Sequence, residues 1–283
     1  MLPPCTTLLY DQVCLEASRL TTHRYSTSFS LGIRSLDKPF RDSIYALYGF
    51  VRFADEIVDS FHGHNQLELL NRFEADTWSA ISEGVSLNPI LHSFQRVINH
   101  FNIDHQLVRQ FLHSMRLDLS PQEYNQALYE EYILGSAEVV GLMCLKVFCK
   151  GDQDEYNQLT PPAMRLGSAF QKINFLRDLK ADRKDLGRTY FPQLSNQTFN
   201  EATKKAIESD IQLDFDAGYS GILALPKGCR LGVYVAYVYY LDLFQKIQQI
   251  PAQHIENQRV RISDRKKIWL LLKCFFKHKF NFI

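Results

Sequence analysis

Apolar side chains recur at intervals of three and four residues along most of this 283-residue chain. That spacing places them on one side of an α-helix, because the helix completes a turn every 3.6 residues. Segments that alternate polar and apolar residues between hairpin turns, as strands do, are almost absent. The pattern therefore predicts an all-α protein. The expected helices include 43–59, 66–81, 89–101, 104–115, 124–150, 162–182 and 231–250.

Turn-forming and helix-breaking residues separate these segments. They stand at 37–39, 84, 120–121, 151–152, 161–162 and 226–228. Ser120 and Pro121 have the form of a helix start, with proline at the first helical position, and the weakly patterned stretch 189–202 is expected to be a loop. No repeat, low-complexity run or change in composition marks a linker, so we expect residues 1–283 to form a single domain.

The composition excludes several classes of protein. The 32 basic and 31 acidic residues give no general attraction to nucleic acid. The six cysteines form no CxxC pair and have no histidine cluster beside them, which argues against a zinc site or a disulfide framework and favours a reducing cytoplasm. The N-terminal stretch does not resemble a secretory signal, and no uncharged apolar run reaches the about 18 residues that span a bilayer. No obligate protein partner is evident.

The segment 265–280 is different in character, because its apolar residues are interrupted by lysine and histidine (RKKIWLLLKCFFKHKF). A basic amphipathic helix of this kind can lie on a membrane surface. It can equally be a last helix that packs Trp269, Leu272 and Phe276 against the core. The sequence leaves both interpretations open.

The first group of chemically capable residues lies in RFADEIVD, residues 52–59. Asp55 and Asp59 are four residues apart, so their carboxylates leave adjacent turns of a helix in the same direction, and Arg52 lies one turn earlier. Such acids are often just a solvated helix face. This helix is otherwise so apolar, however, that we expect it to be buried, where acids need a partner. A cation between the two carboxylates would supply one.

A second expected helix carries four polar side chains at spacings of three, four and four: Gln171, Asn174, Asp178 and Asp182. All four share one face, and that face is rich in oxygen. A hard cation requires such ligands, since Mg²⁺ takes one or two protein carboxylates, keeps several waters and binds phosphate oxygens. Arg177 can donate charge-assisted hydrogen bonds to a diphosphate. The alternative is an exposed polar face at the end of a helix.

Two acidic groups on separate helices of an apolar bundle are a rarer coincidence than either group alone. They predict a pocket with acids on opposite walls, where metal ions hold a diphosphate while apolar helices enclose hydrocarbon chains. Metal ions there would act as Lewis acids and promote ionisation of an allylic C–O bond. Aromatic faces near the pocket would stabilise the resulting carbocation.

Two longer stretches resemble those of a known family. YALYGFVRFADEIVD at 45–59 and GSAFQKINFLRDLKADRKDLGRTYFP at 167–192 are closely similar to the signatures of squalene/phytoene synthases, most of all the bacterial-type phytoene synthases. The resemblance covers about 25–273. It implies the isoprenoid synthase helical bundle with a central apolar cavity. It also implies Mg²⁺-dependent, head-to-head coupling of two prenyl diphosphates through a cyclopropyl diphosphate, with Mn²⁺ as a possible substitute.

The resemblance also implies roles for individual residues. The implied metal ligands are Asp55, Asp59, Asn174, Asp178 and Asp182. The implied substrate-binding residues are Arg52, Arg177, Gln171, Asn174, Ser28, Phe29, Ala137, Gly141, Tyr240 and Arg261. Tyr132 matches the tyrosine that opens a YxxxxAxxxG segment, and it joins the four aspartates as a catalytic candidate.

Some positions near the N-terminus and the second motif depart from the family pattern. Thr27 stands where many relatives carry a basic residue, and Tyr25 where they often carry histidine. His23 and Arg24 are candidates to replace that missing cation. Ala181 replaces an acid that is common beside the last aspartate.

Two further departures concern the expected tunnel for the hydrocarbon chain. Leu134 and Glu138 stand where relatives often have tyrosine and glycine, and Glu138 lies on the segment expected to line that tunnel. The chain length of the substrate is therefore open.

The amino acids in both motifs most resemble those of phytoene synthases. This resemblance favours two C20 geranylgeranyl diphosphates as substrates and phytoene as the product, a reaction that is the first committed step of carotenoid biosynthesis. NADPH is then not expected. The alternative is coupling of two C15 units to squalene, dehydrosqualene or hydroxysqualene. A non-catalytic scaffold of the same fold is disfavoured because such proteins typically lose the aspartates, and a carrier of apolar ligands would not need two acidic motifs. Because the product is insoluble in water, peripheral contact with a membrane is a further expectation.

Overall fold

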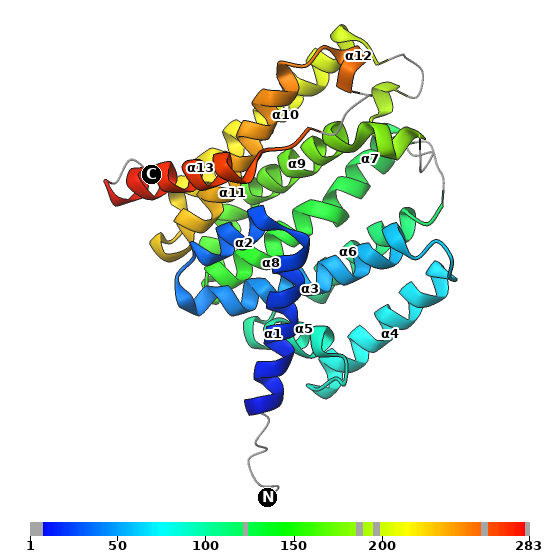
Figure 1. Cartoon of the computed structure of the whole chain (residues 1–283). Coiled ribbons are helices and arrows are strands. Elements are labelled where there is room, and N and C mark those ends of the chain that lie inside the picture. Colours follow the sequence, from blue (N-terminus) through cyan, green and yellow to red (C-terminus); the bar gives the residue numbers. More distant parts are fainter. Residues whose placement is uncertain (1–7, 121–123, 185–188, 195–198, 256–259, 281–283) are drawn as a thin grey trace, which may run out of the picture.

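The computed structural model describes residues 8–120, 124–184, 189–194, 199–255 and 260–280, except for the side chains of 181–184. Helices make up most of this part of the chain, which confirms the predicted all-α class (Figure 1). The elements are α1 (Leu8–Tyr25), α2 (Thr27–Arg34), α3 (Lys38–Ser60), α4 (Gln66–Glu83), α5 (Pro89–Phe101), α6 (His105–Leu117), α7 (Gln126–Ile133), the π-helix η1 (Leu134–Glu138), α8 (Val139–Phe148), α9 (Gln153–Lys184), the 3₁₀-helix η2 (Pro192–Leu194), α10 (Glu201–Ala224), α11 (Lys227–Gln248), α12 (Ala252–Ile255) and α13 (Asp264–Lys279).

Most helix boundaries follow from the local signals in the sequence. Pro39 stands in the first turn of α3, and Gly84 ends α4 with a φ of 72° that favours glycine. Asn88 caps α5 by accepting hydrogen bonds from the amides of Ile90 and Leu91. The helix start expected at 120–121 falls partly outside the described residues. The loop expected at 189–202 is described in part, with η2 inside it and α10 beginning at Glu201.

One predicted boundary is wrong. The break expected at 161–162 does not occur, because α9 continues through both prolines and packs against α10 there. Gly221 of α10 makes room for this contact, since a Cβ at that position would lie 2.6 Å from Pro162 Cβ. The helix expected over 124–150 is observed as one continuous helical stretch over 126–148, in which the π-helix η1 lies between α7 and α8. At 161–162, by contrast, tertiary packing outweighs local propensity.

The sequence pattern did not predict α1, α2 or α10, and their buried faces show why. The buried face of α1 consists of Cys14, Ser18, Thr21 and Thr22. That of α10 includes Lys204, Glu208 and Asp214. Polar residues on the inner side of a helix hide the apolar periodicity on which the prediction depends.

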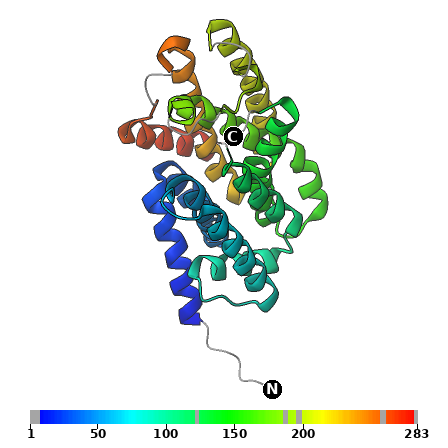
Figure 2. The same cartoon turned by 90° about the vertical axis from the view of Figure 1, so that its right-hand side faces the viewer.

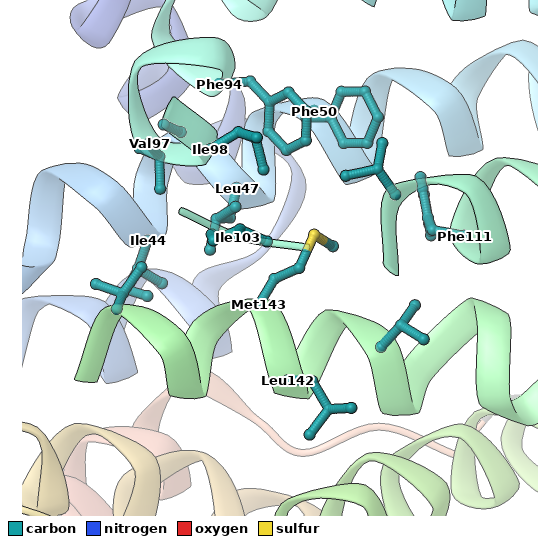
Figure 3. Packing of buried hydrophobic residues seen from close by; sticks show 14 of the residues in the cluster. Ile44, Leu47, Phe50, Phe94, Val97, Ile98, Ile103, Phe111, Leu142 and Met143 are labelled. Carbon is teal, nitrogen blue, oxygen red and sulfur yellow. The ribbon is translucent and has the colours of Figure 1, made fainter. Parts of the chain in front are cut away.

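Two hydrophobic clusters hold the helices together. Figure 2 shows the N-terminal helices, coloured blue to cyan, below the helices coloured green to red. The first cluster joins α3, α5, α6 and α8, with Phe50 stacked on Phe94 at a ring-centroid distance of 3.7 Å (Figure 3). The second joins α9, α10, α11 and α13, and Phe215 and Phe244 lie in it. Residues of both clusters line one cavity, which is consistent with the single domain that we propose.

Candidate active site

A cavity of about 1180 Å³ lies between α2, α3, α8, α9 and α11. Its lining changes from apolar to polar along two of these helices. On α3 the lining begins with Ile44 and Leu47 and ends with Arg52 and Asp55. On α9 it begins with Leu159, Pro162 and Ala163 and ends with Gln171, Asn174 and Arg177. Each helix therefore supplies one apolar and one polar stretch of the wall.

The polar stretches of α3 and α9 line the same end of the cavity. Phe29 of α2 lies between α3 and α11, with its ring 5.6 Å from that of Tyr48 on α3 and 6.2 Å from that of Tyr240 on α11. The Tyr240 hydroxyl in turn donates a hydrogen bond of 3.3 Å to Asn174 Oδ1 on α9. The structure thus brings together the two motifs that the sequence singled out, and Tyr240 and Phe29 lie beside them.

The α3 motif forms an ion-pair cluster. Arg52 Nη1 donates to Asp55 Oδ2 at 2.6 Å, Arg52 also pairs with Glu56, and its guanidinium lies 4.3 Å from the centre of the Tyr25 ring. The Asp55 carboxyl opens onto the cavity rather than onto bulk water, and this burial raises its pKa to about 7. The nearby charge of Asp59 adds to the rise, and Arg52 opposes it. Asp59 itself is exposed one turn beyond the cavity wall.

The α9 motif has a matching arrangement. Arg177 Nε donates to both carboxylate oxygens of Asp178 at 3.1 Å, and the Arg177 side chain also forms part of the cavity wall. Asp178 is partly buried behind this arginine. The backbone of Asp182 belongs to α9, whereas its side chain lies outside the described residues. Each motif thus presents an arginine that is paired with one of the motif's own aspartates.

Tyr132 lines the cavity, and Asp118 fixes its orientation. The Tyr132 hydroxyl donates to Asp118 Oδ2 at 2.7 Å, and the Tyr190 hydroxyl donates to Asp118 Oδ1 at 2.9 Å. Burial and the Asp118 charge hold the pKa of Tyr132 well above its ordinary value, so this phenol stays protonated. Asp118 was not predicted from the sequence. The only signal was an acid directly after the apolar helix that ends at Leu117.

The π-helix η1 forms part of the cavity wall. Ala137 and Gly141 line the cavity, as expected. Gly167 of α9 crosses so close to η1 that a Cβ on it would lie 2.9 Å from the Ala137 carbonyl oxygen. Glu138 was expected to lie on the tunnel wall, but it is not among the described lining residues. Burial raises its pKa to about 7, and the neighbouring charge of Asp214 adds to this rise.

Residues from both ends of the chain complete the polar end. Ser28 and Phe29 of α2 and Arg261, before α13, line the cavity, as predicted. Lys267 of α13 also lines it and donates a hydrogen bond to Thr27 Oγ1, so it supplies a cation beside the position where relatives carry a basic residue. His23 and Arg24, which we considered for this role, are not part of the described lining.

Comparison with known proteins decides the family. The family model for squalene/phytoene synthases matches residues 22–266. The chain belongs to the squalene/phytoene synthase family. It is therefore a prenyltransferase, with the helical fold that the motifs implied. Within the described residues, no helix is long and apolar enough to cross a membrane.

The family's phytoene synthases are among the relatives of this prenyltransferase. It is 28% identical to the phytoene synthase of Arthrospira platensis, over 90% of each chain. It is 30% identical to a chloroplastic phytoene synthase of Narcissus pseudonarcissus, over 98% of this chain and 69% of that one. A crystal structure of a dehydrosqualene synthase in complex with ligand superposes with a TM-score of 0.78 at 21% identity, over 96% of this chain and 98% of the other. That likeness shows the shared fold.

Proposed function

We propose that this prenyltransferase couples two geranylgeranyl diphosphates head to head, through a cyclopropyl (prephytoene) diphosphate, to phytoene. One observation carries the proposal: the polar stretches of α3 and α9, which belong to the two acidic motifs, line one end of a single cavity whose wall along the same two helices is otherwise apolar. Its volume of about 1180 Å³ exceeds the range of about 300–1,000 Å³ that is usual for drug-sized ligands. A cavity of this size suits a pair of long hydrocarbon chains.

The donor set of the polar end fits Mg²⁺. In the described part of the chain no three acids, histidines or cysteines form a ready metal cluster, and Mg²⁺ does not need one, since it keeps waters and binds phosphate oxygens. Burial and the nearby charge of Asp59 raise the pKa of Asp55 although Arg52 opposes the rise, so a further cation beside this carboxyl would favour its charged form. We propose that Asp55 and Asp59 of α3, and Asn174, Asp178 and Asp182 of α9, hold the ions. Bound there, Mg²⁺ would neutralise the leaving diphosphate and assist C–O ionisation.

The arginines have a separate role in the proposed mechanism. Arg52 and Arg177 now neutralise Asp55 and Asp178, respectively. Once cations are near those acids, each guanidinium is free to turn toward phosphate oxygens, for which its planar donor fork is suited. Gln171, Lys267 and Arg261 line the same end and would add further donors to the diphosphates.

The apolar wall and the aromatic rings would protect and stabilise the carbocation. Exclusion of water prevents its capture as an alcohol. Phe170 and Tyr240 stack at 4.0 Å, with Phe170 on the cavity wall beside Gln171, and their faces favour positive charge. Tyr132, held by Asp118, presents a protonated phenol at a fixed position. We propose that Ala137 and Gly141 leave room for the hydrocarbon chain.

The second candidate function is coupling of two C15 units, because the chain shares its fold with a dehydrosqualene synthase. We favour C20 substrates because relatives named phytoene synthase are 28% and 30% identical over at least nine-tenths of this chain, whereas the dehydrosqualene synthase structure is 21% identical. For the same reason NADPH is not expected to be required. We place the protein in the cytoplasm, in peripheral contact with a membrane that receives the product.

A product assay tests the proposal. Purified protein is incubated with Mg²⁺ and either geranylgeranyl or farnesyl diphosphate, with and without NADPH, and the extracted hydrocarbons are identified by mass. We expect a C40 hydrocarbon from geranylgeranyl diphosphate, formed without NADPH and abolished by a chelator. A product from farnesyl diphosphate alone would move the function to C15 coupling, and no product from either substrate would contradict the proposal.

A further inference from the structure

Helix α13 is attached to the rest of the protein by one side only. Leu270 and Cys274 are buried against the second hydrophobic cluster. The Tyr239 hydroxyl donates to the Lys267 carbonyl oxygen at 2.8 Å, and Lys266 pairs with Asp242 of α11 at 2.5 Å. These contacts fix which side of the helix faces inward.

The opposite side of α13 is apolar and faces outward. Six large side chains on it are each more than half exposed: Ile268, Trp269, Leu272, Phe275, Phe276 and Phe280. We call them the outer face of α13. The alternative in which Trp269, Leu272 and Phe276 pack against the core is therefore wrong. An open hollow of about 480 Å³ lies among members of this face, with Lys273 and Lys277 at its edge. Contiguous exposed apolar surface of this kind marks an interaction site.

Basic side chains border the outer face. Lys273 lies with its ammonium 5.4 Å from the centre of the Trp269 ring, and Lys273, Lys277 and Lys279 are exposed. Between Asp264 and Lys279 the sequence holds six lysine or arginine residues and one acid, whereas the rest of the chain has more acids than bases. Positive charge is thus concentrated at the one surface that also exposes a row of aromatic and aliphatic side chains.

We propose that the outer face of α13 docks the protein on an anionic lipid bilayer. Apolar rings at the centre would enter the acyl boundary, and long lysine side chains at the edge would reach the phosphate groups. Anionic headgroups complement the lysines, and a fluid bilayer needs no matching shape, which suits a row of unpaired apolar side chains.

The position of α13 relative to the cavity supports this assignment. Arg261, Ser263, Asp264 and Lys267 line the cavity, so the docking helix begins at the cavity wall. This part of the argument rests on the proposed function: two apolar chains that leave the cavity beside α13 would pass directly into lipid. The charge and exposure of the outer face are independent of it.

Vesicle flotation tests the docking surface on the full-length protein. The vesicles contain phosphatidylcholine with phosphatidylglycerol, or phosphatidylcholine alone. The test variant carries Trp269→Gln, Leu272→Gln and Phe276→Gln. Its matched control carries Leu67→Gln, Val85→Gln and Leu87→Gln, three exposed apolar residues in and beside α4. We expect the wild type and the control to float with anionic vesicles, and the test variant to bind at least about a hundredfold more weakly.

A second variant separates the charge from the apolar contact. Lys273→Gln with Lys279→Gln is expected to weaken binding to anionic vesicles about 20-fold, with little effect on vesicles of phosphatidylcholine. Circular dichroism and turnover of detergent-dispersed substrate should stay at wild-type levels in both variants, so that loss of docking is distinguished from failure of the proposed function. Flotation of the test variant like the wild type would overturn the proposal. So would light scattering that shows a wild-type dimer which the test variant converts to a monomer, since the face would then join two copies.

Discussion

Asp55→Asn and Asp178→Asn are each expected to lower the rate of product formation by at least about a hundredfold. Asparagine keeps the size of the side chain and removes its charge, so a cation and the diphosphate lose one of their attachments on that wall. In the structure each acid is paired with an arginine of its own motif. The variant would therefore also leave that arginine without its resting partner. Initial rates at saturating substrate, followed by extraction of labelled product, measure the effect.

The matched control is Asp76→Asn on α4, an exposed acid that belongs to neither motif and does not line the cavity. It should keep the wild-type rate. Far-ultraviolet circular dichroism should be the same for all three variants, because none of these positions contributes an apolar side chain to the core. Near-normal turnover in either Asp55→Asn or Asp178→Asn, with the fold intact, would show that the acids do not hold the reacting diphosphate.

Asp214→Ala is expected to destabilise the fold by about 3–5 kcal/mol, without touching the cavity lining. Asp214 is fully buried on α10 and accepts hydrogen bonds from three side chains of α9: Arg165 at 2.9 Å, Ser168 at 2.8 Å and Lys172 at 2.7 Å. Removal of the acid leaves the largely buried Lys172 with Asp210 as its remaining partner. Urea unfolding followed by circular dichroism measures the change in the free energy of unfolding.

The double variant Lys172→Met, Asp214→Leu separates loss of the ion pair from loss of packing. It removes both charges together, and we expect it to recover most of the lost stability. Arg19→Ala is a surface control: it breaks an exposed pair with Asp42, and it should cost at most about 1 kcal/mol. A loss below about 1 kcal/mol for Asp214→Ala would show that this cluster does not hold α9 against α10.

The parts of the site that the sequence predicted are those on strongly periodic helices. Asp55 on α3, and Gln171 and Asn174 on α9, lie on helices whose apolar faces indicate which side is buried. The spacing of the polar residues within each motif therefore showed that their side chains point in the same direction. The same reasoning failed for α10, since its buried residues Lys204, Glu208 and Asp214 are charged. In a single sequence, a charged residue is predicted to be on the surface unless its partner on another helix is known.

Residues whose role depends on contacts distant in sequence were also not predicted. Asp118 is linked to the cavity through Tyr132, whose hydroxyl donates to its carboxylate, and Tyr190 donates to the same carboxylate from a distant part of the sequence. Lys267 is separated from Thr27 by 240 residues, although the two share a hydrogen bond. In α13 apolar residues occupy almost the whole circumference, so hydrophobicity alone could not show that Leu270 and Cys274 face inward and Trp269 outward.

The central claim is that α3 and α9 jointly hold a metal–diphosphate group at one end of the cavity. Calorimetric titration with a geranylgeranyl thiodiphosphate, whose C–S bond resists ionisation, tests it without turnover. We expect binding by the wild type and by Asp76→Asn that requires Mg²⁺, and binding weakened about 10–100-fold in both Asp55→Asn and Asp178→Asn. Equal affinity in a chelator, or wild-type affinity in both cavity variants, would contradict the account.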